Sequence, residues 1–115
     1  MKMLASSSEE RLIPSPVLVE VDYLLRTHIG PTAFLRLLED IREGAFVIVD
    51  LEYSDYVRTE QIISRYSDSD IGFVDAAVLA IVERLDEPKL ATLDRRHFSM
   101  MRPRHVDALQ LVPDL

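Results

Sequence analysis

The sequence contains no cysteine. This absence excludes disulfide bonds, thiolate metal ligands and a cysteine nucleophile, and it fits a reducing compartment such as the cytoplasm. Long apolar runs are also missing, since none approaches the roughly 20 residues that a membrane-spanning helix needs. The first eight residues hold one lysine and a very short apolar run, which does not predict a signal peptide. We therefore expect a cytoplasmic protein with no membrane partner.

Basic residues are outnumbered by acidic ones. The chain has 13 lysines and arginines against 20 aspartates and glutamates, a formal net charge of −7 at pH 7. Proteins that coat nucleic acid through bulk electrostatics are normally basic, so this charge argues against that class. It leaves open an enzyme whose acidic residues are concentrated in a metal site. Solubility alone would also explain the excess of acid.

The remaining composition is that of a soluble globular domain. Of 115 residues, 48% are hydrophobic and 29% are charged. This length suits one domain with a real core and is too short for two. Because the sequence shows no repeat, low-complexity tract or linker, we treat residues 1–115 as a single domain.

Helical and extended segments alternate along the chain. Amphipathic or apolar periodicity, together with proline and glycine punctuation, predicts helices over 15–30, 31–44, 52–66 and 69–85. Short apolar runs predict strands at 11–14, 45–51, 89–94 and 108–112, and a short helix or turn at 95–101. Strands that are buried on both faces and alternate with helices indicate an α/β fold, a parallel sheet sandwiched by helices.

Two carboxylates stand on apolar helix faces. In "SDIGFVDAAVLAIVERL" (69–85) the helix is apolar on nearly every face, yet Asp75 lies near its start. The residues three and four positions from Asp75 carry no cation: Ile71, Gly72, Val78 and Leu79. Glu20 is in the same situation, with neighbours Pro16, Val17, Tyr23 and Leu24. A carboxylate so placed should protonate, pair with a distant arginine, or bind a metal.

The positions of these acids near helix starts offer a simpler explanation. If Ser15 and Asp70 are the N-caps, Glu20 and Asp75 lie in the second turns, near the positive ends of the helix dipoles. That placement stabilises a negative charge by about 1 kcal/mol, whereas burial of an unpaired ion costs several. The residues alone leave a metal site and an ordinary helix-start role as open alternatives.

A third acid, Asp94, ends the predicted strand at 89–94. Ligands of parallel sheets bind beyond the carboxyl ends of the strands. If both helix starts meet this end, Glu20, Asp75 and Asp94 form an oxygen-only site that suits Mg²⁺ or Mn²⁺. Asp70 and Thr92 are weaker candidates, because an N-cap and a strand residue explain them as well.

The neighbouring basic residues are less informative. Arg95 and Arg96 follow Asp94 and could contact phosphate, although paired arginines are common in surface turns. The three histidines show no ligand spacing, so we expect none of them in the metal site, and we expect His97 to pack beside Phe98.

Three blocks of the chain together resemble a known family. "IPSPVLVEVDYLL", "YSDSDIGFVDAAVLAIVERL" and "LATLDRRHF" are similar, in order and spacing, to blocks of the PIN domain, most closely in VapC-type ribonuclease toxins of bacterial toxin–antitoxin pairs. The resemblance covers residues 11–113. It implies a parallel sheet sandwiched by helices and Mg²⁺- or Mn²⁺-dependent cleavage of RNA, often tRNA or rRNA, by four acidic residues.

The resemblance also assigns roles and partners. Glu20, Asp75 and Asp94 match three of the four acids; Thr92 stands where members often have Thr or Ser, and Asp70 where some carry a further acid. Members usually form homodimers and are held by a cognate VapB-like antitoxin that covers the acidic groove.

The start of the chain departs from the family pattern. Members open with a strand that ends in Asp, and nothing here matches it; residues 1–10 correspond at best to the tail of a helix. We therefore expect a domain without its usual first strand and first acid. An inactive PIN domain that binds an antitoxin or itself is the main alternative, and a metal-dependent phosphatase a remote one.

Overall fold

The computed structural model describes residues 3–5, 10–92 and 95–112. The predicted helices and strands all form, within the same or shorter boundaries, and the α/β fold is confirmed. The elements in chain order are β1 (Met3–Ala5), β2 (Arg11–Pro14), α1 (Val17–His28), α2 (Ala33–Arg42), β3 (Val47–Val49), α3 (Tyr53–Arg65), the 3-10 turn η1 (Ser67–Ser69), α4 (Phe73–Arg84), β4 (Lys89–Ala91), α5 (Arg95–Met100) and β5 (Gln110–Val112).

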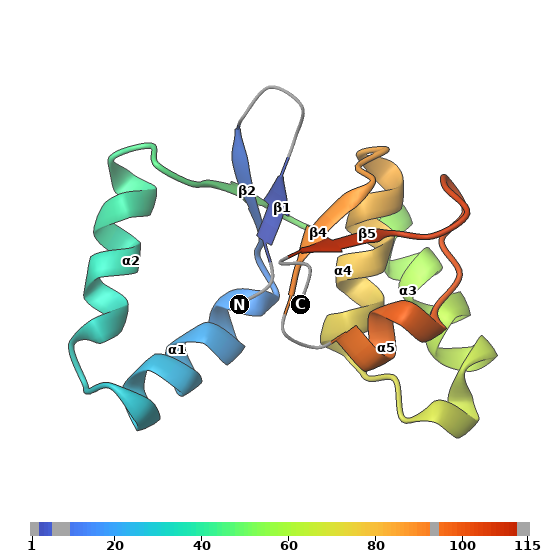
Figure 1. Ribbon diagram of the computed structural model, residues 1–115, viewed down its shortest axis with the longest axis horizontal. Coiled ribbons are helices and arrows are strands. Elements are labelled where there is room, and N and C mark those ends of the chain that lie inside the picture. The colour runs from blue at the N-terminus through green and yellow to red at the C-terminus, as the bar shows by residue number, and fades with distance from the viewer. Residues whose placement is uncertain (1–2, 6–9, 93–94, 113–115) are drawn as a thin grey trace.

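The strands form one mixed sheet in the order β3-β2-β1-β4-β5 (Figure 1). β2 pairs in parallel with β3, and β4 pairs in parallel with β5. β1 is antiparallel to both of its neighbours, β2 and β4. Because β1 is reversed relative to both, β2 and β4 run in the same direction. The carboxyl ends of β2, β3, β4 and β5 therefore meet at one edge of the sheet.

The central strand β1 was not predicted. Its Leu4 lies opposite Leu12 of β2 on one side and Leu90 of β4 on the other. The expectation that residues 1–10 correspond to the tail of a helix is wrong for residues 3–5. The physical reason is that two facing strand edges leave backbone N–H and C=O groups to be paired, and three residues in extended conformation can pair with both edges.

The strand at 47–49 is less buried than its apolar sequence predicts. Val47 is 40% exposed, and Ile48 and Val49 are only partly buried. β3 is the outermost strand of the sheet, so one of its edges has no neighbouring strand. A β-branched apolar run identifies a strand correctly, but its position within the sheet decides how much of it is covered.

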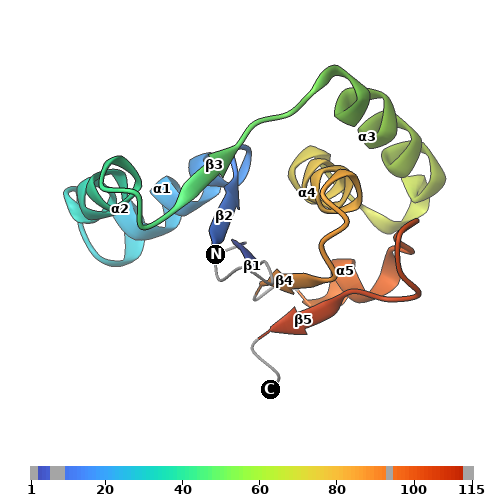
Figure 2. The same cartoon turned by 90° about the horizontal axis from the view of Figure 1, so that it is seen from above.

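The helices form two groups. In both views α1 and α2 lie to one side of the strands, and α3, α4 and α5 lie to the other (Figures 1 and 2). α3 packs against α4, while α1 packs against α2 and β2. No helix within the described residues is long and apolar enough to cross a membrane.

The helix α4 is the centre of the core. All eight residues from Asp75 to Val82 are buried. A helix that is apolar around its whole circumference requires neighbours on several sides. α4 packs against α3, and Figure 2 shows α5 and β4 on its other side. The predicted burial of this segment is confirmed.

Truncating the centre of α4 should cost much of the stability. Leu79 is fully buried, so Leu79→Ala should lower the free energy of unfolding by about 2–5 kcal/mol, as lost burial and a residual cavity add together. Leu35→Ala is the matched control, because Leu35 is 60% exposed on α2 and should lose no more than about 0.5 kcal/mol. Urea unfolding followed by circular dichroism measures both. Equal losses would contradict the central position of α4.

Candidate acidic site at the carboxyl edge of the sheet

Three helices begin at the edge where the strands end. α1 starts at Val17, shortly after β2 ends at Pro14, and α5 starts at Arg95, shortly after β4 ends at Ala91. α4 returns to β4 through a short connection, so it runs opposite to β4 and starts at that same edge (Figure 1). The topology therefore places the starts of α1, α4 and α5 where ligands of parallel sheets bind.

Asp75 lies in the first turn of α4 and is 8% exposed. Its predicted burial is confirmed. The N-cap of α4 is Gly72, however, and the prediction of Asp70 as the cap is wrong. Asp70 is exposed and has a left-handed backbone (φ 57°) that ends η1. Asp75 is consequently closer to the positive end of its helix than predicted.

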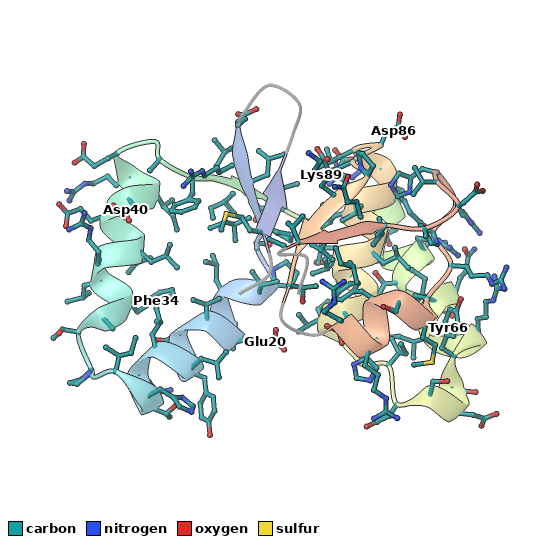
Figure 3. The ribbon with its side chains drawn as sticks, in the orientation of Figure 1. Glu20, Phe34, Asp40, Tyr66, Asp86 and Lys89 are labelled. Atoms are coloured by element: carbon teal, nitrogen blue, oxygen red, sulfur yellow. The ribbon has the colours of Figure 1, made fainter. Side chains whose placement is uncertain are left out.

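Glu20 has a different setting. It lies in the first turn of α1, behind the N-cap Pro16, and it is exposed. The predicted N-cap Ser15 makes no side-chain cap; its backbone N–H donates to Val49 O at 2.9 Å. Val17 and Val21 face the core instead, so the predicted apolar burial of Glu20 is wrong. In Figure 3 its side chain points from α1 towards α4 and α5.

The third predicted acid, Asp94, falls outside the described residues, which break at 93–94. Thr92, directly before this break, is 2% exposed, and its backbone N–H donates to Val112 O at 2.9 Å. Within the described part of the chain, no three acidic or histidine side chains are grouped as metal ligands. The set Glu20, Asp75 and Asp94 therefore stays a prediction, as do the weaker candidates.

The structure adds one residue that the sequence reasoning missed. His97, on α5, places its Nδ1 3.3 Å from Oδ2 of Asp75. The two side chains are 25% and 11% exposed, so the contact is largely shielded from water. The expectation that His97 only packs beside Phe98 is wrong, although Phe98 itself is buried at 2%. The available signal was the position of His97 only three residues after Asp94, an acid that the resemblance assigns to the site.

The two arginines after Asp94 differ in exposure. Arg95 is half-buried, and its Nη1 lies 3.5 Å from Leu111 O, whereas Arg96 is exposed. Both stand at the start of α5, at the edge that holds Asp75. The other histidines lie elsewhere: His28 is in the last turn of α1, and His105 Nε2 contacts Glu87 O at 2.8 Å.

Comparison with known proteins agrees with this arrangement. The PIN domain matches residues 2–102 of the chain. The chain is also 37% identical over 98 residues to ribonuclease VapC26 of Mycobacterium tuberculosis, an alignment that covers 84% of this chain and 73% of that protein. With these matches added to the sheet order, the buried Asp75 and the helix starts around it, the chain belongs to the PIN-domain family and is of the VapC type.

Proposed function

We propose that this protein is a ribonuclease toxin of a toxin–antitoxin pair and cleaves RNA phosphodiester bonds at the acidic edge with a divalent cation. The observation that carries the proposal is the buried carboxylate of Asp75 at the edge of the sheet where α1, α4 and α5 begin. The similarity to a protein named as a ribonuclease supports the choice of RNA as substrate.

The donor chemistry of this edge fits Mg²⁺ or Mn²⁺. Glu20, Asp75 and Asp94 would supply carboxylate oxygens, the donors that hard divalent cations prefer, and Thr92 could hold a metal-bound water. Because Asp75 is only 8% exposed, a cation bound to its carboxylate would interact with it in a low dielectric, which strengthens the attraction. When bound, such a cation lowers the pKa of a water molecule and offsets charge on the phosphodiester.

Residues at this edge have different roles in holding the cation and the RNA. Asp75 belongs to the buried part of α4, so packing keeps its backbone and Cβ in a constant position at the edge. Glu20 is exposed and can reach groups that approach the edge from solvent. Arg96, exposed at the start of α5, is placed to contact an RNA phosphate, with Arg95 beside it. Because the net charge is −7, such local contacts rather than bulk attraction must hold the RNA.

Cation dependence and Glu20 together test this proposal. Purified protein incubated with end-labelled tRNA and rRNA should cleave in Mg²⁺ or Mn²⁺, stop in EDTA, and recover when the cation is restored. Glu20→Gln should lower the rate by about tenfold or more, because it removes the charge and one anionic oxygen. Asp22→Asn on the same helix is the control, since Asp22 lies 3.9 Å from Arg26 on the surface. Cleavage that persists in EDTA, or equal rates for both variants, would refute the proposal.

We also propose a cognate VapB-like antitoxin and a second copy of the chain as partners. Large apolar side chains stand exposed on α1, directly after it and on α2, with Val19 at 76%, Ile29 at 73% and Leu35 at 60%. Exposed apolar side chains of this kind are available to contact a partner protein. If a co-expressed antitoxin bound tightly while no RNA was cut, the inactive, antitoxin-binding PIN domain would be the better description.

A further inference from the structure

We propose that His97 is a positioning residue for Asp75: its imidazole Nδ1–H donates to Oδ2 of Asp75 and fixes the orientation of the carboxylate that would bind the cation. This inference rests on the proposed function. The motivating contact is the 3.3 Å separation of these two atoms, in a setting largely shielded from water. An ionised carboxylate only accepts hydrogen bonds, so a hydrogen bond between these atoms requires the proton to be on Nδ1 of the ring.

Both side chains are held by the core rather than by flexible segments. Asp75 belongs to the buried segment 75–82 of α4, and α5 is anchored by Phe98 and by Met101 directly after it, which are 2% and 3% exposed. The separation of the two helices is thus set by packing. An imidazole has two side-chain torsions, so holding it against a carboxylate costs little entropy compared with holding a lysine or arginine there.

A positioned carboxylate matters for a hard cation. Mg²⁺ demands a narrow range of oxygen positions, and Asp75 can rotate its two oxygens about the terminal bond of its side chain. A donor on one oxygen removes that rotation. Groups that orient ligands in this way typically contribute 10–100-fold to metal affinity without touching the metal. His97 would therefore act through Asp75 and set the affinity for the cation.

The alternative roles of His97 predict different behaviour. If the ring only filled space, any side chain of similar size would replace it. If its Nε2 were the important atom, a glutamine would replace it best, because the glutamine amide lies near the Nε2 position. If Nδ1 is the important atom, as we propose, asparagine should replace it best, because the asparagine amide nitrogen lies near the Nδ1 position. Three variants distinguish these roles: His97→Asn, His97→Gln and His97→Ala.

The experiment measures Mn²⁺ binding by each full-length variant in calorimetric titrations, with RNA absent. We expect His97→Ala and His97→Gln to raise the dissociation constant by about 10–100-fold, and His97→Asn to stay within about threefold of the wild-type value. In cleavage assays at low Mn²⁺ the rates should fall in the same order, while a large excess of Mn²⁺ should restore them and leave the KM for RNA unchanged. A purely structural role would not produce recovery by added cation.

Each outcome decides the question. Equal Mn²⁺ affinity for all three variants and wild type, or a loss in His97→Asn as large as in His97→Ala, overturns the positioning role while the proposed function stands. A wild-type protein that neither binds Mn²⁺ nor cleaves RNA overturns the proposed function, and the positioning role with it. Urea unfolding in EDTA checks the fold; if His97→Ala proves unfolded, the comparison of Asn with Gln decides alone.

Discussion

Replacing Asp75 with asparagine is expected to reduce cation-dependent RNA cleavage on the order of a hundredfold, which corresponds to about 2.7 kcal/mol in the activation barrier. Asparagine has nearly the shape of aspartate, so the packing around this 8% exposed position should survive. The variant lacks the negative charge and one anionic oxygen. Both are needed to hold a divalent cation, and the low dielectric of a buried position increases the effect of their loss.

The substitution Asp75→Asn should have a small effect on the free energy of unfolding and a large effect on the rate of RNA cleavage. A buried carboxylate contributes little net stability, because desolvation offsets its interactions, and the neutral amide can still accept a hydrogen bond from His97. We therefore expect the free energy of unfolding to change by no more than about 1 kcal/mol. This separation between activity and stability is typical of residues kept for function at the expense of the fold.

The matched control lies at the other end of the same helix. Asp86 is exposed in the turn after α4 and has a left-handed backbone (φ 53°), a conformation that asparagine also tolerates. It stands far from Glu20 and the start of α5 in Figure 3. Asp86→Asn should cleave RNA like the wild type in a time course with labelled RNA. If the two variants were equally active, Asp75 would not take part in the chemistry.

The sequence predicts most of the local structure and part of the site. α4 could be recognised because apolar residues occupy all its faces, and the burial of Asp75 follows directly from that pattern. The same reasoning failed for Glu20, since the face of α1 that is covered depends on what packs against it. There Val17 and Val21 meet the core, while the apolar Tyr23 and Leu24 beside Glu20 remain 58% and 48% exposed.

Features that depend on contacts between distant parts of the chain could not be predicted from the sequence. The three residues of β1 carry no strong strand signal, and their position follows from two strand edges that the rest of the fold supplies. The exposure of Val47 follows from strand order, which a hydrophobic run does not specify. The meeting of His97 with Asp75 joins two helices separated by β4, and its distance depends on how α5 packs. Periodicity reports local burial, whereas these features are set by tertiary packing.

Asp55→Ala should be strongly destabilising, with a loss of about 3–5 kcal/mol in the free energy of unfolding. Asp55 is 2% exposed at the start of α3, and both its oxygens lie within 3.1 Å of Arg84 Nε, at the end of α4. Its Oδ2 also accepts from the backbone N–H of Glu52 at 2.8 Å, which completes a capping box. Each charge stands at the end of its helix that favours it.

The loss would come chiefly from the groups left behind. Without Asp55, Arg84 keeps Glu52 Oε1 at 3.3 Å and Asp50 O at 3.1 Å, but its Nε–H loses its acceptor in a largely buried setting. The backbone N–H of Glu52 also loses its acceptor, which removes one half of the capping box of α3. The matched control is Asp40→Ala, which breaks the exposed pair with Arg36 and should cost no more than about 1 kcal/mol. Urea unfolding of both variants gives the comparison.

A double-mutant cycle would show whether the Asp55–Arg84 ion pair holds α3 against α4. If Asp55 and Arg84 act mainly on each other, Asp55→Ala combined with Arg84→Ala should cost clearly less than the sum of the two single losses. Simple additivity would mean instead that capping of α3, not the ion pair, supplies the effect. The distinction reaches the candidate site, because the end of α4 held by Asp55 belongs to the helix whose other end carries Asp75. Breaking the Asp55–Arg84 pair should therefore weaken cation binding as well as lower the stability of the fold. The control Asp40→Ala should leave cation binding unchanged.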